Sequence, residues 1–121
     1  MVNTLYKENI LDHYKNPRNF KALDSCSKNA CLNNSTCGDE MEVFLNIEDD
    51  FVKDVTFQAR GCALSIASMS MLTEKIKGKK IDEIEKITDD EVLKMVGLEK
   101  DSPRIKCVLL GIETLRKALH Q

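Results

Sequence analysis

The sequence predicts an α+β fold, in which a small antiparallel sheet of about three strands packs against N-terminal, central and C-terminal helices. Three observations indicate it. Residues 41–59 alternate between apolar and polar positions, longer segments repeat apolar residues at helical spacing, and the 121 residues are 42% hydrophobic. A chain of this size buries roughly two thirds of its unfolded surface. We therefore expect one domain over residues 1–121.

The first element is a helix over residues 4–16, where Leu5, Ile10 and other apolar side chains recur at helical spacing until Pro17 stops the pattern. Residues 17–36 lose this periodicity and are rich in Asn, Ser, Asp and Lys, which favour turns. We expect a long connection there, with one short edge strand.

A β-hairpin follows. Apolar residues occupy every second position over residues 41–47, and again at Val55, Phe57 and Ala59. Its loop is predicted to be Glu48, Asp49 and Asp50. Because an isolated pair of strands is only marginally stable, the apolar face of the hairpin must be covered by the helices that come after it.

Three helical segments and a helical turn over 81–87 complete the chain. After Cys62 a long helix rich in small residues runs towards Gly78, and these small residues would let it lie close against the sheet. Thr88 begins a capping box for a short helix that ends at Gly97. Ser102 is predicted to cap the last helix, with a proline in its first turn and an apolar stripe down to Leu119.

Composition narrows the classes of function. A formal net charge of −2 and an aromatic content of 5% argue against nucleic acid as a partner. No apolar run approaches the ~20 residues that span a bilayer, and the N-terminus has no apolar block of the secretory type. We expect a cytoplasmic protein, without a membrane partner, whose five cysteines are mostly thiols.

The cysteines supply the candidate site. Cys37 and Asp39 flank Gly38, which permits a backbone conformation that aims both side chains at one point. Cys62 falls where strand gives way to helix, and Cys107 lies in the early turns of the last helix, where thiolates are favoured. Three thiols and one carboxylate could meet at one metal ion, although their long spacings alone leave simple packing open as an alternative.

The remaining candidates are weaker. Cys26 and Cys31 lie in the polar connection and are expected to have no essential role. His13 is expected to pack in its helix or to contact a partner, and His120 lies in the C-terminal tail, so neither is expected to act as a base. Positive charge beside the thiols, including Arg60, could lower their pKa, which alkylation rates against pH would test.

Several segments, taken together, closely resemble the U-type iron-sulfur cluster assembly scaffolds, the family of IscU, SufU and the N-terminal domain of NifU. They are DHYKNPRN (12–19), TCGD (36–39), GCALSIAS (61–68), KGK (77–79) and RIKC (104–107). The resemblance spans nearly the whole chain in the same order. It implies a SufE/IscU-like α+β fold and a site of Cys37, Asp39, Cys62 and Cys107 that holds a transient [2Fe-2S] cluster or zinc.

The resemblance also implies partners: a cysteine desulfurase that supplies sulfur, an iron donor, and apo iron-sulfur proteins that receive the cluster. Cys107 is the first candidate sulfur acceptor and Cys37 the second. Lys106 stands where many IscU-type proteins have histidine, so histidine ligation is excluded there. The segment 100–104 lacks the Leu-Pro-Pro-Val-Lys signal that resembles an Hsp70-type chaperone's recognition site, which argues against that partner.

Two alternatives to the scaffold stay open. One is a zinc-dependent, SufU-like sulfurtransferase, in which zinc remains on the same four residues and releases a thiol to capture persulfide sulfur. The sequence supports it with the SufU-like segments TCGD and RIKC, but the interval from Cys62 to Cys107 is too short for the insertion typical of that branch. The other is a structural zinc domain that binds a partner protein.

Overall fold

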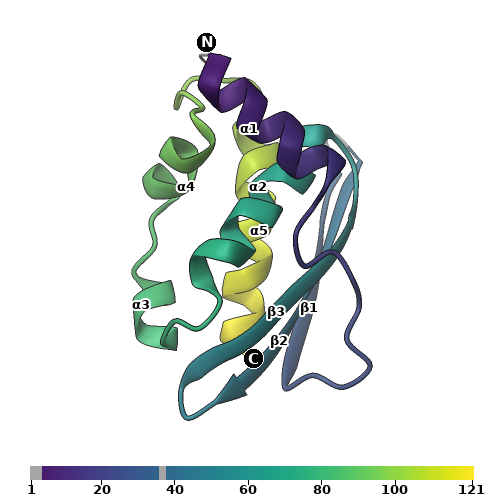
Figure 1. Ribbon diagram of the computed structural model, residues 1–121, viewed down its shortest axis with the longest axis vertical. Coiled ribbons are helices and arrows are strands. Elements are labelled where there is room, and N and C mark those ends of the chain that lie inside the picture. The colour runs from purple at the N-terminus through teal and green to yellow at the C-terminus, as the bar shows by residue number, and fades with distance from the viewer. Residues whose placement is uncertain (1–3, 36–37) are drawn as a thin grey trace.

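The structure is a computed structural model that describes residues 4–35 and 38–121. Its elements (Figure 1) are α1 (Thr4–Lys15), β1 (Lys28–Asn34), β2 (Asp39–Glu48), β3 (Phe51–Arg60), α2 (Ala63–Ile76), α3 (Ile81–Glu85), α4 (Asp89–Val96) and α5 (Ile105–Leu119). The fold is α+β, as the sequence predicts, and it includes an edge strand, β1, within the long connection.

The three strands form one antiparallel sheet in the order β1-β2-β3. Val43 of β2 lies between Ala30 of β1 and Phe57 of β3, and all three side chains are buried. The alternating pattern of the hairpin is thus confirmed, because the residues predicted to share a face do share the buried face of the sheet.

The hairpin loop is shorter than predicted. Glu48 still pairs with Phe51, so only residues 49–50 form the turn, and both have positive φ angles, of 52° and 66°. Positive φ at both central positions gives a two-residue turn the twist that matches its flanking strands. Glu48 is polar and directly precedes two aspartates, so the sequence alone gives no sign that it belongs to the strand.

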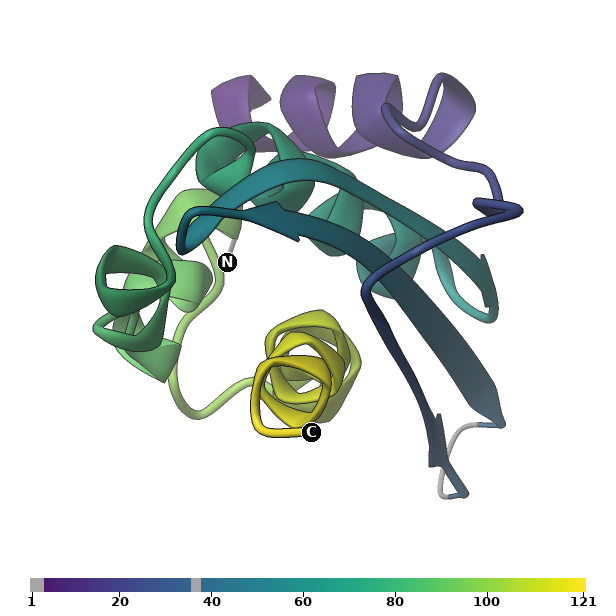
Figure 2. The ribbon, with the colours of Figure 1, turned by 90° about the horizontal axis from the view of Figure 1, so that it is seen from below.

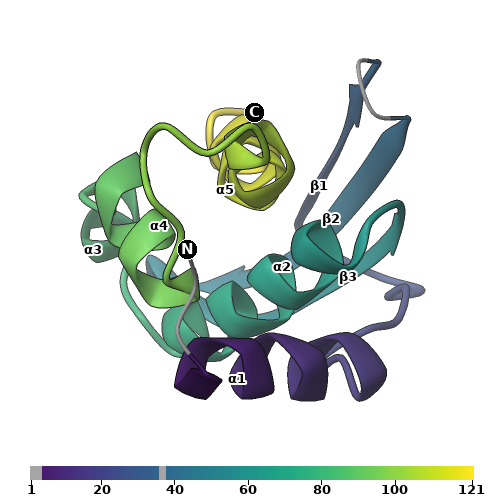
Figure 3. The same cartoon turned by 90° about the horizontal axis from the view of Figure 1, so that it is seen from above.

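The sheet curves around α5, which lies in its concavity, while α2 runs beside α5 and α1 packs on the far side of α2 (Figures 2 and 3). The Ser68 hydroxyl on α2 donates to the carbonyl of Val108 on α5 at 2.8 Å. The small residues predicted to bring α2 close to the sheet therefore also bring it close to α5. This contact places the beginnings of both helices near the start of β2.

The predicted helix ends are confirmed in part. Thr88 is the N-cap of α4, where its side chain accepts a hydrogen bond from the backbone N–H of Glu91, and Gly97 is the C-cap. The assignment of Ser102 as a cap is wrong, because the N-cap of α5 is Arg104. Ser102 instead accepts a hydrogen bond from the Arg104 N–H within the preceding turn.

Large apolar side chains that remain exposed gather on α1 and just after it. They are Leu5, Tyr6, Leu11, Tyr14 and Phe20. Phe20 also packs edge-on against Phe57, with ring centroids 5.1 Å apart. Within residues 4–35 and 38–121, no helix combines the length and the apolar character needed to cross a membrane.

His13 attaches α1 to α2. Its Nδ1 lies 2.7 Å from the Ser70 hydroxyl, which also accepts the backbone N–H of Arg18 at 2.8 Å. Since that hydroxyl already accepts one hydrogen bond, its own proton can be donated to Nδ1 of a neutral imidazole. Nε2 lies 3.6 Å from a Glu74 carboxylate oxygen. The packing role expected for His13 is confirmed, and the side chain is only 6% exposed.

The contact that His13 makes between α1 and α2 should contribute less to stability in mild acid. Burial lowers the pKa of His13 below its ordinary value of 6.5, and the charge of Arg18 acts in the same direction, while Glu74 and Asp12 oppose it. Below pH 6.5 the unfolded chain therefore binds more protons than the folded one. The free energy of unfolding is expected to fall as pH drops through that value, by at most about 1.4 kcal/mol per pH unit.

Urea unfolding at about pH 7.5 and pH 5.5, with a chelator present, measures this loss. In His13→Gln, the free energy of unfolding should differ less between the two pH values than it does in the wild type. His120→Gln alters an exposed side chain at the end of α5 and should show the wild-type difference. If the free energy of unfolding of His13→Gln depends on pH as strongly as that of the wild type, groups other than His13 cause the dependence.

Candidate metal site

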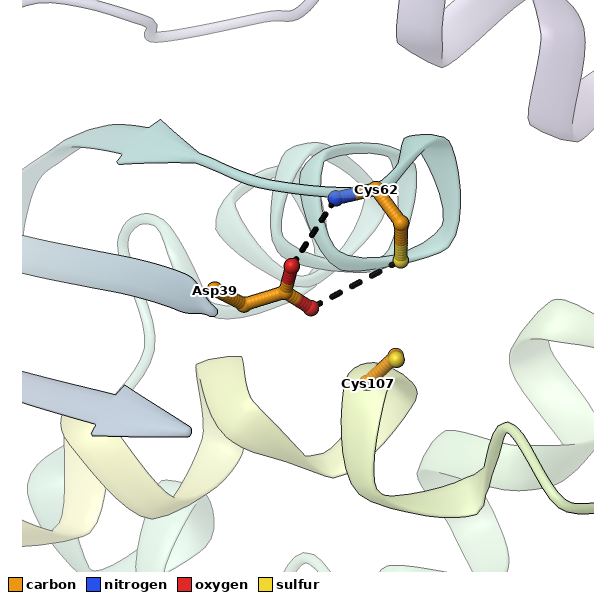
Figure 4. A group of neighbouring side chains, drawn as sticks. All are labelled: Asp39, Cys62 and Cys107. Carbon is orange, nitrogen blue, oxygen red and sulfur yellow. Dashed lines mark hydrogen bonds between the residues drawn. The ribbon is translucent and has the colours of Figure 1, made fainter. Parts of the chain in front are cut away.

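Asp39, Cys62 and Cys107 converge at one point (Figure 4). Each can offer one ligand atom, and these three atoms lie within 4.8 Å of one another. The residues are separated by 23 and 45 positions in the sequence, so only the fold brings them together. Cys37, the fourth residue of the predicted set, lies outside the described residues.

Each of these side chains sits at the beginning of an element. Asp39 is the first residue of β2, Cys62 is the N-cap of α2, and Cys107 is the third residue of α5. The predicted positions of both cysteines at helix starts are confirmed. The Asp39 side chain is buried, Cys62 is half-buried, and Cys107 is 8% exposed. Gly38, just before Asp39, has a φ of 73°, the unusual backbone conformation expected for it.

Hydrogen bonds fix the Asp39 carboxylate. Its Oδ1 accepts the backbone N–H of Cys62 at 3.0 Å, and its Oδ2 accepts the Ser65 hydroxyl at 2.6 Å. Cys62 makes no side-chain cap of its own, so a carboxylate from the sheet occupies the N-terminus of α2 in its place. The partial positive charge at that end of the helix favours the ionised carboxylate.

Gly61 makes room for this carboxylate. A Cβ atom at Gly61 would overlap the side chain of Asp39, and Gly61 also has a φ of 151°, which side chains rarely adopt. The passage from β3 into α2 is thus shaped around Asp39. Glycine is required here for both its conformation and its lack of a side chain.

Ser65 is a residue of the site that sequence reasoning missed. Its Oγ lies 3.6 Å from the Cys62 sulfur and 3.1 Å from the backbone carbonyl of Cys107, in addition to its bond with Asp39. Its position three residues after Cys62, close to one helical turn, relates it to that cysteine, but the sequence does not indicate that it faces Asp39.

The basic residue close to Cys62 in sequence has another partner. Arg60 forms an ion pair with Glu40 across the hairpin, at 3.0 Å, and its side chain is largely exposed. The charge of Arg60 is therefore paired with the Glu40 carboxylate on the neighbouring strand.

Cys26 and Cys31 do not join the cluster within the described part of the chain. Cys31 lies on β1 opposite Glu42, and burial, together with a hydrogen bond to Glu42, raises the pKa of its thiol above the ordinary value. A raised pKa disfavours the thiolate that binds metals. Cys26, Cys31 and Cys62 occur as free thiols in the described part of the chain.

The donor set fits a thiophilic metal. Tetrahedral ligands at zinc-sulfur and zinc-oxygen bond lengths lie roughly 3.3–3.8 Å apart. Cys62 Sγ and Asp39 Oδ2 are 3.6 Å apart, and all three ligand atoms need to move by only about an ångström to meet that spacing. Thiolates bind zinc and iron-sulfur clusters firmly, whereas the harder carboxylate oxygen holds such metals less well.

Comparisons with known proteins agree with this chemistry. Residues 5–121 match the family described as NifU-like N terminal domain. The chain is 37% identical over 116 residues to iron-sulfur cluster assembly scaffold protein IscU 1 of Archaeoglobus fulgidus, covering 95% of this chain and 74% of the relative. It is 36% identical over 135 residues to zinc-dependent sulfurtransferase SufU of Bacillus subtilis, covering 98% and 91%.

Solved structures show the same fold. A crystal structure of the SUF-system protein named FiSufU, from thermophilic Fervidobacterium islandicum, superposes with a TM-score of 0.80. It is 26% identical to this chain, and the superposition covers 93% of this chain and 94% of the other. The N-terminal part of a NifU-like protein from Brucella abortus superposes with a TM-score of 0.83 at 21% identity, over 95% of this chain and 92% of the other.

Proposed function

Because the chain belongs to the family of NifU-like N-terminal domains, we propose that it is a scaffold on which iron-sulfur clusters are assembled. The single observation that carries the proposal is the convergence of Asp39, Cys62 and Cys107 from three separate elements. The product is a [2Fe-2S] cluster held by these residues and Cys37. A set of three thiolates and one weaker oxygen ligand suits temporary storage, since one ligand is easily exchanged.

Assembly needs sulfur, which a cysteine desulfurase would deliver as a persulfide. The acceptor thiolate, Cys107 or Cys37, attacks the outer sulfur of the donor persulfide, so the donor's S–S bond breaks and the donor cysteine leaves as a thiolate. Cys107 is only 8% exposed, so the donor persulfide would have to reach it at the point where it meets Asp39 and Cys62. An iron donor supplies ferrous iron, and an electron donor supplies the electrons that reduce each persulfide sulfur to the sulfide of the cluster. Apo iron-sulfur proteins then receive the cluster.

A second function is supported by the relative from Bacillus subtilis, which is named as a zinc-dependent sulfurtransferase. Here zinc would stay at the same residues and only sulfur would pass through the protein. The donor set accommodates zinc without redox chemistry. The two functions differ in whether iron is ever bound, which an experiment can decide.

Anaerobic reconstitution with ferrous iron, cysteine and a desulfurase separates them. A scaffold is expected to develop visible cluster absorption and to transfer the cluster to apo-ferredoxin, while a sulfurtransferase would gain only the mass of added sulfur and keep its zinc. Cys62→Ser should abolish the absorption, and Cys31→Ser, outside the cluster of ligands, should leave it intact. Sulfur transfer without any cluster would overturn the scaffold and support the alternative.

Mass spectrometry of the same samples locates the sulfur. Added mass on Cys107 supports the first acceptor, and added mass confined to Cys37 identifies the second acceptor instead.

A further inference from the structure

We propose that Ser65 is a positioning residue of the metal site, whose hydroxyl holds the oxygen of Asp39 that faces the two sulfurs. The inference deepens the proposed function and rests on it. Ser65 does not need to touch the metal for this role. It acts through Asp39.

The placement of Ser65 supports this role. The side chain is 1% exposed and lies on α2, where its hydroxyl is within hydrogen-bond distance of Asp39 and of the Cys107 carbonyl. Its Oγ also lies beside the Cys62 sulfur, so this one hydroxyl contacts all three residues of the site. A buried hydroxyl that lost these acceptors would cost about 1–3 kcal/mol, so its position is well determined.

The two carboxylate oxygens of Asp39 have different hydrogen-bond partners and positions. Oδ1 accepts the backbone N–H of Cys62, whereas Oδ2 points towards the sulfur of Cys62 and lies on the side of Cys107 (Figure 4). Oδ2 is therefore the oxygen placed to bind a metal. Because a carboxylate oxygen has two lone pairs, it can accept the Ser65 hydroxyl and still coordinate an ion.

A hydrogen bond of this kind fixes the orientation of a ligand. Outer hydrogen-bond partners of metal ligands commonly contribute about 10- to 100-fold to metal affinity. Without the Ser65 hydroxyl, Asp39 would keep its bond to the Cys62 N–H but could rotate Oδ2 away from the sulfurs. Ser65 thus sets how often the carboxylate presents its second lone pair to the metal.

Ser68 provides a matched control. It lies one turn further along α2, is as buried as Ser65, and donates to the backbone carbonyl of Val108 on α5 at 2.8 Å. Both hydroxyls therefore lie beside a backbone carbonyl in the first turns of α5, but the single proton of Ser65 is best placed to be donated to Asp39, at 2.6 Å, rather than to the Cys107 carbonyl at 3.1 Å. Any effect caused only by the contact between the two helices should appear in both variants.

The test is titration of the metal-free protein with Co²⁺, whose visible spectrum reports thiolate ligands and coordination geometry. Ser65→Ala is expected to weaken Co²⁺ binding about 10-fold and to change the ligand-field bands, while Ser68→Ala should bind nearly as the wild type does. In an Asp39→Ala background, Ser65→Ala should cause no further loss, because a residue that acts through Asp39 has nothing left to position. Circular dichroism confirms that each variant is folded.

The outcomes are separable. Equal losses in Ser65→Ala and Ser68→Ala, or a Ser65→Ala loss that persists fully in the Asp39→Ala background, would assign Ser65 a structural role and overturn the inference. A wild type that binds Co²⁺ through Asp39 while Ser65→Ala binds equally well overturns the inference but leaves the proposed function standing. A wild type that does not bind Co²⁺ overturns both.

Discussion

Gly61→Ala is expected to reduce metal affinity by about 100-fold, because the new methyl group would occupy the space of the Asp39 carboxylate. The carboxylate would have to leave its place beside the Cys62 N–H, and the site would lose its oxygen ligand. The positive φ of Gly61 adds backbone strain of about 1–3 kcal/mol, which lowers the free energy of unfolding. Zinc titration and urea unfolding measure the two effects.

Gly78→Ala is the matched control for Gly61→Ala. Gly78 also has a positive φ, of 82°, but a Cβ atom there would meet nothing within 4 Å. Its substitution should lower the free energy of unfolding through strain and leave zinc affinity unchanged. If Gly61→Ala proves too unstable to titrate, its cost in unfolding free energy should shrink in an Asp39→Ala background, where the carboxylate is absent. An equal cost in both backgrounds would contradict the proposed overlap.

Asp39→Ala should slow the transfer of an assembled cluster to an apo-protein severalfold. An incoming thiolate must displace one ligand first, and the carboxylate oxygen is the one held least firmly by iron. Without it, exchange has to begin at a cysteine thiolate. Transfer is followed by the rise of the cluster spectrum in apo-ferredoxin under anaerobic conditions.

Glu40→Ala serves as the control for Asp39→Ala, because it removes the neighbouring carboxylate on the same strand, which pairs with Arg60 on the surface. Its transfer rate should match that of the wild type. A rate for Asp39→Ala that equals the wild-type rate would show that Asp39 is not the exchangeable ligand. If cluster transfer is slowed equally in Asp39→Ala and Glu40→Ala, the change in net charge would explain the slower transfer, and the loss of a ligand would not.

The sheet and the helices can be predicted because their signals are periodic. Alternation places Val43 and Phe57 on one face without any knowledge of β1, and capping chemistry locates Thr88. Ser102 misleads because a serine followed by proline is a common start of a helix, whereas here the chain makes one more turn and α5 begins at Ile105. A local signal does not exclude such a turn.

The site can be predicted only in part. Thiols and a carboxylate carry recognisable chemistry, so the sequence alone identifies Cys62, Cys107 and Asp39 as candidate ligands. Ser65 and Gly61 act through contacts across 26 and 22 positions of the sequence, with Asp39 as the common partner. Serine and glycine are frequent residues, and a single sequence gives no sign of which one faces a carboxylate.

The three candidate ligands stand at the beginnings of β2, α2 and α5, so they meet only in a chain whose sheet and both core helices have docked. A metal ion or cluster that binds at this site and not to the unfolded chain would stabilise the native state by RT ln(1 + [L]/Kd). If the proposed function holds, cluster binding and conformational stability would be thermodynamically linked: release of the cluster would return the protein to a less stable form, and an incompletely folded chain would not bind the cluster at this site.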